Sequence, residues 1–143
     1  MPSNIGKNLM ARHFIVTADG GSRGNPGAAA YGAVVYENNE IVKELGASIG
    51  VASNNVAEYQ GLIAGLKGVN EIDPTATILV KMDSKLVVEQ MSGRWKVKHP
   101  NMQKLAKEAF AAHDSTLVSY QWIPREENSH ADSILNDVLD SGM

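Results

Sequence analysis

The sequence predicts an α/β fold in which helices cover a five-stranded mixed sheet. Two observations support this prediction. Some segments are short β-branched or alternating apolar runs typical of strands, and others carry apolar residues every three or four positions, as helices do. Along the chain these segments come as three strands, a helix, a strand, helices, a strand and a helix. The 143 residues suffice for one domain, and no internal repeat or linker interrupts them.

The first half of the chain predicts three strands followed by a helix. Apolar and β-branched residues mark the strands, and Asn38-Asn39 between the second and third is typical of a hairpin turn. Helical spacing starts at Asn54 and stops before Asp73, and either Ser53 or Asn54 can cap the first turn. The predicted strands are Arg12–Asp19, Ala30–Tyr36 and Glu40–Ile49, with a glycine-rich turn over Gly20–Gly27.

The second half predicts a central strand, two helices, a fifth strand and a last helix. Ser84 can cap a short helix that Gly93 ends, and Ser129 can open the last helix. A stripe of apolar residues from Met102 to Phe110 predicts the helix between them. The predicted strands are Thr75–Met82 and Thr116–Ile123, with a basic connection over Arg94–Pro100 and a charged loop over Pro124–Asn128.

The composition excludes several classes of protein. With no cysteine, the chain has no disulfide scaffold, thiolate zinc site or cysteine nucleophile. A net charge of −3 provides no global positive field, so a polyanionic partner must be bound locally. Residues 1–10 contain no apolar run that would indicate a signal peptide or a membrane span. We therefore expect a cytoplasmic protein without membrane contact, with a disordered tail over 1–11, a domain over 12–140 and a C-terminal end over 141–143.

Four acidic residues lie at the ends of predicted elements. Asp19 and Asp83 end two strands, so they would lie together if those strands are parallel neighbours. Glu58 and Asp132 fall in the first turns of two helices, at the margin of the apolar stripes. Each acid alone could be a helix cap or a solvated charge. Their joint pattern instead predicts a common site.

Four converging carboxylates would need a counter-charge. Two like charges about 4 Å apart repel by roughly 4 kcal/mol at an effective dielectric constant of 20. Oxygen ligands without cysteine or clustered histidine favour hard divalent cations, Mg²⁺ or Mn²⁺. A pair of such ions suits in-line displacement at phosphorus, because one generates the attacking hydroxide and the other stabilises the leaving oxygen. The acids therefore indicate chemistry on a phosphodiester.

Four segments carry motifs in a fixed order, of which the first two are specific and the last two gain their weight from the order. They are Thr17–Gly27, with Asp-Gly before Gly-Asn-Pro-Gly; Ser53–Glu58, with paired Asn before Glu; Met82–Ser84; and Ala131-Asp132. Together they resemble type I ribonuclease H, over about Arg12 to Asp140. This resemblance implies the ribonuclease H-like fold and an endonuclease that uses Mg²⁺ to hydrolyse the RNA strand of RNA–DNA hybrids, leaving 5′-phosphate and 3′-hydroxyl ends. The catalytic, metal-binding residues that it implies are Asp19, Glu58, Asp83 and Asp132, which would hold two Mg²⁺ ions, with Mn²⁺ as an alternative.

The resemblance also implies substrate contacts by asparagine. Asn25, Asn54 and Asn55 match family positions that meet 2′-hydroxyls and base edges in the minor groove. An asparagine amide can both donate and accept there, and the 2′-hydroxyl distinguishes RNA from DNA. Turn and capping chemistry would also account for these residues without any ligand.

A basic stretch provides further candidate substrate contacts. Trp95 and Lys96 resemble the family's Gly-x-Trp-Lys region, where cations beside an aromatic residue could hold phosphates of the DNA strand. Lys85 stands where some members have Gln. The stretch is short and lacks the long basic protrusion of some members, so we expect weaker and more salt-sensitive binding. A solvated loop with Trp95 packed inward is the alternative.

The sequence departs from the family before its last acid. Many members carry a histidine in a long flexible loop there, whereas this chain leads almost directly into the last helix. His130 is therefore expected to be a helix-start residue, and Arg125 or Glu127 are the alternatives for the loop's role.

The predicted partner is an RNA–DNA hybrid bound by a monomer. Neither G-x-G-x-x-G nor a complete Walker sequence is present, so no nucleotide cofactor is expected. Two alternatives stay open: a non-catalytic hybrid-binding module, and a nuclease on the same fold with another nucleic-acid substrate. The complete set of acids argues against the first, and the paired asparagines argue against the second.

Overall fold

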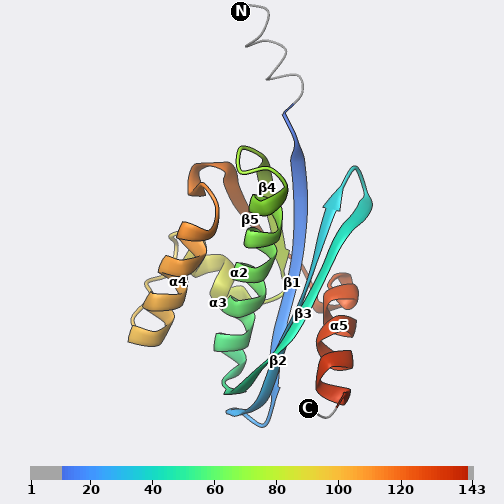
Figure 1. Cartoon of the computed structure of the whole chain (residues 1–143). Coiled ribbons are helices and arrows are strands. Elements are labelled where there is room, and N and C mark those ends of the chain that lie inside the picture. The colour runs from blue at the N-terminus through green and yellow to red at the C-terminus, as the bar shows by residue number, and fades with distance from the viewer. Residues whose placement is uncertain (1–10, 142–143) are drawn as a thin grey trace, which may run out of the picture.

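The computed structural model describes residues 11–141 as a five-stranded mixed sheet with helices on both faces (Figure 1). This architecture confirms the predicted fold class. The strands are β1 (His13–Arg23), β2 (Gly27–Glu37), β3 (Glu40–Ala52), β4 (Thr77–Met82) and β5 (Val118–Trp122). The helices are α2 (Asn54–Ile72), α3 (Lys85–Met91), α4 (Pro100–Ala112) and α5 (Ser129–Asp140), with 3-10 turns at Ser115–Leu117 and Arg125–Glu127. The predicted tail and C-terminal end lie outside the described residues, apart from residues 11 and 141.

The order of the strands brings β1 and β4 together. The sheet runs β3-β2-β1-β4-β5, with β1, β2 and β3 antiparallel and β4 parallel to both β1 and β5. Ala18 of β1 pairs with Met82 of β4. The next residues along the chain are Asp19, still in β1, and Asp83, directly after β4, so the expected adjacency of these acids is confirmed.

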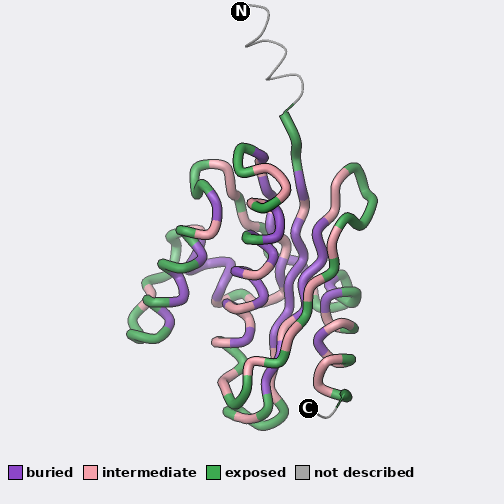
Figure 2. The backbone as a smooth tube through the Cα atoms, in the orientation of Figure 1, coloured by how far each residue is buried: buried purple, intermediate pink, exposed green. Residues whose placement is uncertain are grey.

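The core lies between the sheet and α2. Phe14 and Val16 of β1 are buried, as are Leu62 and Leu66 of α2, and Figure 2 shows this burial along the central strands. A Cβ added at Gly65 would lie 2.4 Å from Val16 Cγ1, so the helix backbone approaches the strand closely. Apolar burial on this face fixes where α2 begins relative to β1.

The helix α5 covers the other face of the sheet. Gly32 of β2 faces it, because a Cβ there would lie 2.3 Å from the carbonyl oxygen of Ala131. Asp19 is the register partner of Gly32, so its side chain projects toward this face, where α5 carries Asp132. None of the helices in residues 11–141 has the length and apolar character needed to cross a membrane.

The glycine-rich turn is shorter than predicted. Strand β1 continues through Gly20 and Gly21, which pair with Tyr31 and Ala30 of β2, and only residues 24–26 form the turn. The reason is a close approach of backbones, since a Cβ on Gly20 would lie 2.1 Å from the carbonyl carbon of Ala57 in α2. Gly20 is therefore needed because α2 packs closely on β1 there, and not because the chain turns.

Side chain–backbone bonds shift other boundaries. Asp73 accepts from the backbone N–H of Thr75 at 2.9 Å, which delays β4 to Thr77. Asp114 accepts from the N–H of Thr116 at 3.0 Å and starts a 3-10 turn ahead of β5. Strand β3 extends to Ala52, three residues beyond its predicted end at Ile49.

The structure also answers two expectations about the helices, namely which residue caps α2 and whether Phe110 faces the core. Ser53 is the residue that caps α2, since its Oγ accepts from the N–H of Val56 at 3.2 Å. Phe110, predicted to face the core, is 47% exposed, because the apolar stripe of α4 continues through Ala109 instead.

The two adjacent glycines of β1 allow a matched test of the close approach. We expect Gly20→Ala to destabilise the fold by at least about 1–3 kcal/mol, because an added methyl group must push α2 away from β1. Gly21→Ala is the control, since its Cβ would meet nothing nearer than 3.6 Å. Urea unfolding followed by circular dichroism measures both, and equal midpoints would contradict the packing argument.

Candidate active site

The four acidic residues singled out from the sequence line one cavity of about 400 Å³. Asp19 comes from β1 and Glu58 from near the start of α2, Asp83 follows β4, and Asp132 lies in the first turn of α5. Four segments far apart in the sequence therefore meet where the parallel strand β4 ends, the edge at which sites of open α/β sheets form.

The close approach of α2 to β1 places two of the carboxylates on a single donor. The backbone N–H of Gly20 donates to Asp19 Oδ1 at 3.0 Å and to Glu58 Oε1 at 2.8 Å. Both carboxylates thus accept from the same N–H group. The missing side chain of Gly20 is what lets the backbone of Glu58 come so near.

Burial and mutual repulsion disfavour the ionised forms of this pair. Burial raises the pKa of Asp19 to about 8, helped by the charge of Asp83 and by the carboxyl of Asp132. Burial also raises the pKa of Glu58 to about 9, helped by the charges of Asp19 and Asp83. The Gly20 N–H partly opposes both shifts. A cation at this position would relieve the repulsion.

The donor set fits a hard divalent cation in its chemistry. All four candidate ligands are carboxylates, and Mg²⁺ and Mn²⁺ prefer such oxygen ligands. However, within residues 11–141 no three His, Asp or Glu side chains form a ready-made ligand group. The tight cluster expected from the sequence is therefore absent from residues 11–141, and the four acids instead share the lining of one cavity.

Asn128 is a residue of this site that sequence reasoning missed. It ends the loop before α5, and its Nδ2 donates to Asp83 Oδ1 at 2.7 Å and to the carbonyl oxygen of Ala18 at 2.8 Å. In the sequence it is simply the last residue of a charged loop, a common place for a cap. No spacing rule connects it to Asp83, 45 residues earlier.

The three predicted asparagines lie around the start of α2. Asn54 lines the acidic cavity, and its Oδ1 accepts from the N–H of Ser22 at 2.9 Å. The Asn54 N–H donates to Asn25 Oδ1 at 3.1 Å, which ties the β1–β2 turn to the helix. Asn55 lines a second cavity of about 520 Å³ together with Ser53 and others. Asn25 and Asn54 thus have structural bonds, and Asn55 faces a separate hollow.

The predicted basic contacts are spread over a wider surface. Lys85 Nζ lies 5.6 Å from the ring centre of Trp122, whose Nε1 donates to the carbonyl oxygen of Asp83 at 3.2 Å. Lys85 is thus linked through Trp122 to the backbone of Asp83, although neither Lys85 nor Trp122 lines the acidic cavity. Trp95 and Lys96, on the α3–α4 connection, are both exposed, and Trp95 is 47% exposed rather than packed inward.

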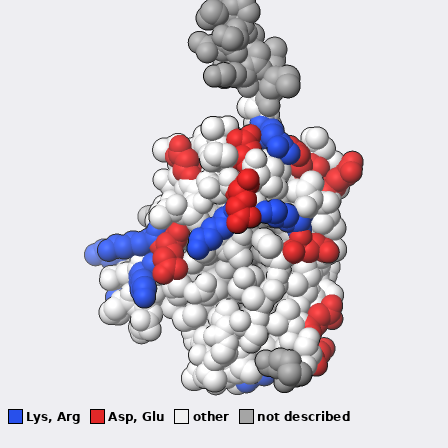
Figure 3. All heavy atoms as spheres, viewed as in Figure 1, with Lys and Arg blue, Asp and Glu red and all other residues white. Residues whose placement is uncertain are grey.

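On the face that Figure 3 shows, Lys and Arg side chains lie among Asp and Glu side chains and form no broad basic patch. Arg94, next to Trp95, pairs with Glu89 at 2.5 Å through its Nε. A nucleic acid would thus meet local contacts rather than a uniform positive field, as the net charge predicts.

The cationic residues that line the acidic cavity are two arginines. Arg23 and Arg125 line the acidic cavity, whereas His130 bonds to Glu44 on β3 and does not line it. The expectation that His130 is a helix-start residue is confirmed. Of the two alternatives, Arg125 reaches the cavity and Glu127 does not line it.

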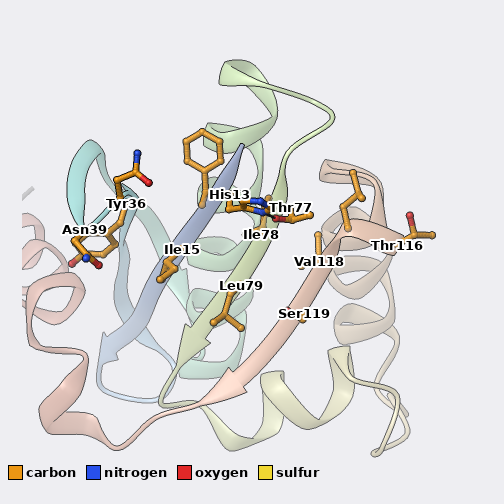
Figure 4. A pocket seen from close by; sticks show the side chains of 13 residues that line it. His13, Ile15, Tyr36, Asn39, Thr77, Ile78, Leu79, Thr116, Val118 and Ser119 are labelled. Carbon is orange, nitrogen blue, oxygen red and sulfur yellow. Dashed lines mark hydrogen bonds between the residues drawn. The ribbon is translucent and has the colours of Figure 1, made fainter. Parts of the chain in front are cut away.

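Another cavity, of about 470 Å³, lies at the opposite ends of the parallel strands (Figure 4). It is lined by residues from the beginnings of β1, β4 and β5, and His13 there bonds to Thr77. No acidic residue lines it, so it offers none of the chemistry of the carboxylate site.

The raised pKa values predict how stability depends on pH. Without metal, the folded state should bind more protons than the unfolded state between about pH 4 and 9, because the pKa values of Asp19 and Glu58 rise from 3.8 and 4.5 to about 8 and about 9. This contribution is complete below the ordinary values and is lost as pH rises through the folded ones. We expect urea midpoints in EDTA to fall over this range.

In Asp19→Asn the urea midpoint should fall less between pH 5 and pH 9, because one of the repelling carboxylates is gone. Added Mg²⁺ should raise the urea midpoint of the unchanged chain at pH 9, because the cation offsets the repulsion and binds only the folded state. The same urea unfolding experiment at pH 5, 7 and 9 measures both. A slope that is identical in Asp19→Asn and in the unchanged chain would contradict the assignment.

Sequence comparison places the chain among known proteins. Residues 17–138 match the family described as reverse transcriptase-like. The bifunctional protein Rv2228c of Mycobacterium tuberculosis is 52% identical over 130 residues, which are 89% of this chain and 35% of that protein. Ribonuclease HI of Halobacterium salinarum is 38% identical, covering 85% and 62% of the two chains. This chain thus spans about a third of the length of the first relative.

Solved structures agree with the sequence matches. The N-terminal RNase H domain of Rv2228c has a TM-score of 0.86 at 49% identity, covering 92% of this chain and 96% of that one. LC11-RNase H1, solved in complex with an RNA/DNA hybrid, has a TM-score of 0.83 at 34% identity, covering 90% and 98%. Fold, motif order and both kinds of similarity lead to one conclusion: the chain belongs to the reverse transcriptase-like family and, within it, to the type 1 ribonuclease H enzymes.

Proposed function

We propose that this chain hydrolyses the RNA strand of RNA–DNA hybrids and leaves 5′-phosphate and 3′-hydroxyl ends. The observation that supports this proposal most is the meeting of Asp19, Glu58, Asp83 and Asp132 at one cavity. The hybrid complex of the similar LC11-RNase H1 supports the substrate class. We propose that the domain acts as a cytoplasmic monomer and needs no nucleotide cofactor.

The four carboxylates are proposed to hold two Mg²⁺ ions, with Mn²⁺ as an alternative. When bound, such ions supply an activated water and a counter-charge for the leaving oxygen. The chain's own part is to hold the ligands in place. The Gly20 N–H orients Asp19 and Glu58, and Asn128 orients Asp83. Packing keeps these groups together despite their repulsion.

Recognition of the hybrid is proposed to involve the start of α2. Asn54 lines the acidic cavity and Asn55 the second one, so consecutive residues join the two hollows. Amide groups here can meet 2′-hydroxyls and base edges of a shallow minor groove. Asn25 supports this surface through its bond to Asn54. A hybrid lying across both hollows would place its RNA strand over the acids.

Basic and aromatic residues are proposed to contact the RNA–DNA hybrid outside the acidic cavity. Lys85 lies beside Asp83 and would contact the substrate near the reacting phosphate. Trp95 and Lys96 are exposed on the α3–α4 connection and would meet phosphates of the DNA strand. Because Arg94 pairs with Glu89, few positive charges remain to bind these phosphates. The affinity for the hybrid should therefore fall as the salt concentration rises.

A strand-labelled cleavage assay tests the proposed reaction. We expect Mg²⁺-dependent cleavage of the RNA strand of a hybrid, no cleavage in EDTA, and no cleavage of duplex DNA. Cleavage of a DNA strand would favour the nuclease with another substrate, and hybrid binding without cleavage would favour the non-catalytic module.

Asp83→Asn separates chemistry from binding. Removing one ligand charge should lower kcat by at least about 1,000-fold, or about 4 kcal/mol, while binding of the hybrid persists. Circular dichroism checks that the variant folds. A folded Asp83→Asn variant with kcat unchanged would overturn the metal-binding role of this acid.

Lys96→Ala tests the proposed grip on the DNA strand. We expect KM to rise and the slope of log affinity against log salt to shrink by about 1, with kcat nearly unchanged, because one phosphate contact is lost. Lys67→Ala, on the exposed surface of α2, removes the same charge elsewhere and is the control. Equal effects of both substitutions would show that only net charge matters.

A further inference from the structure

Asn128 is a buried polar residue that is hydrogen-bonded to Asp83, one of the four acids that line the cavity. Only 2% of its surface is exposed. Its Nδ2 donates to Asp83 Oδ1 at 2.7 Å and to the carbonyl oxygen of Ala18, the residue before Asp19, at 2.8 Å. One amide group therefore connects the acid after β4 to the backbone of β1.

The backbone of Asn128 also reaches the fourth acid. Its carbonyl oxygen accepts from the N–H of Asp132 at 3.1 Å, within the first turn of α5. Through three hydrogen bonds, Asn128 contacts Asp83, Asp132 and the strand that carries Asp19. Displacing it would release the relative positions of three segments at once.

Helix capping does not explain this arrangement. Asn128 occupies the N-cap position of α5, where an asparagine side chain usually accepts from an N–H of the first turn. Here the side chain makes no capping bond. Its Oδ1 is buried, with no hydrogen-bond partner among residues 11–141. The side chain is turned away from the helix and toward Asp83, so its orientation follows the acid and not the helix.

The amide of Asn128 is a suitable donor to Asp83, because a carboxylate that binds a cation must stay negatively charged. An amide N–H is neutral, so it orients a carboxylate without neutralising it. A Lys or Arg at this place would form an ion pair with Asp83 and compete with a bound cation. The bond occupies Oδ1 of Asp83 and fixes the plane of the carboxylate. Hydrogen bonds of this kind hold metal ligands in orientation in many proteins.

We propose that Asn128 is a positioning residue that sets the orientation of Asp83 and its spacing from Asp19 for divalent cation binding. This inference rests on the proposed function, because it assigns a role to Asn128 within the same carboxylate site. It differs from a structural role in what it predicts: the affinity for the cation and the rate of chemistry depend on Asn128, and hybrid affinity does not.

Two substitutions distinguish positioning from capping. Asn128→Ala removes both the donor and any cap, whereas Asn128→Ser keeps a good N-cap but is too short to reach Asp83. Calorimetric titration of the full chain with MgCl₂ and with MnCl₂ measures cation affinity. We expect both variants to bind each ion 10–100-fold more weakly, roughly as for other supporting partners of metal ligands. In cleavage of the hybrid, kcat should fall while KM stays within about twofold.

Asn70→Ala is the matched control. Asn70 of α2 also uses its amide, donating to His113 Nδ1 at 3.1 Å, but far from the acids along its helix. We expect this variant to lose stability in urea while keeping its Mg²⁺ affinity and kcat. Comparable loss of Mg²⁺ affinity in Asn70→Ala would overturn the proposal, because general destabilisation would then suffice.

A double-mutant cycle completes the test. In an Asp83→Asn background, Asn128→Ala should weaken Mg²⁺ binding no further, since its effect passes through Asp83. Full additivity of the two losses would contradict the proposal, as would unchanged Mg²⁺ affinity in Asn128→Ser. Failure of the proposed function is separate: a chain that binds Mg²⁺ but does not cleave hybrids leaves the titrations able to decide the role of Asn128.

Discussion

Repulsion among one buried and three half-buried carboxylates is the constraint around which this site is organised. Asp19 and Glu58 share the N–H of Gly20, and burial raises the pKa of both. The Gly20 N–H favours the ionised forms, but burial and the neighbouring charges outweigh it. The arrangement persists because apolar burial holds α2 against β1, where Gly65 meets Val16 and Gly20 meets Ala57. The core thus maintains a locally unfavourable site, a frequent relation between packing and function.

The hydrogen-bond donors to the acids are neutral and do not cancel a negative charge there. Gly20 N–H and Asn128 Nδ2 are neutral donors. The ion pairs among residues 11–141 lie elsewhere and include none of the four acids. Arg23, which lines the cavity, pairs with Asp140 near the end of α5. The negative charge of the cavity is therefore left for a ligand, although salt bridges are common on the rest of the surface.

Local patterns predicted the order of the elements and all four acids, because periodicity and motif spacing are properties of neighbouring residues. They failed where two distant segments decide the outcome. Gly20 was predicted as turn and is strand, since its need for glycine comes from Ala57. Asn128 looked like an ordinary loop residue, since its partners Ala18 and Asp83 are 110 and 45 residues away. Tertiary contacts alone reveal such roles.

The negative charge of the acidic cavity also bears on which residues can bind the substrate and which can hold the metal under the proposed function. An acidic cavity in a chain of net charge −3 repels a phosphate backbone, so it cannot itself provide affinity for a polyanion. The proposed grip therefore falls to neutral and basic residues beside it, such as Asn55 and Lys96. Because these lie in another cavity and on another connection, they can change without disturbing the acids. Under the proposed function, substrate affinity and catalysis are consequently assigned to different residues.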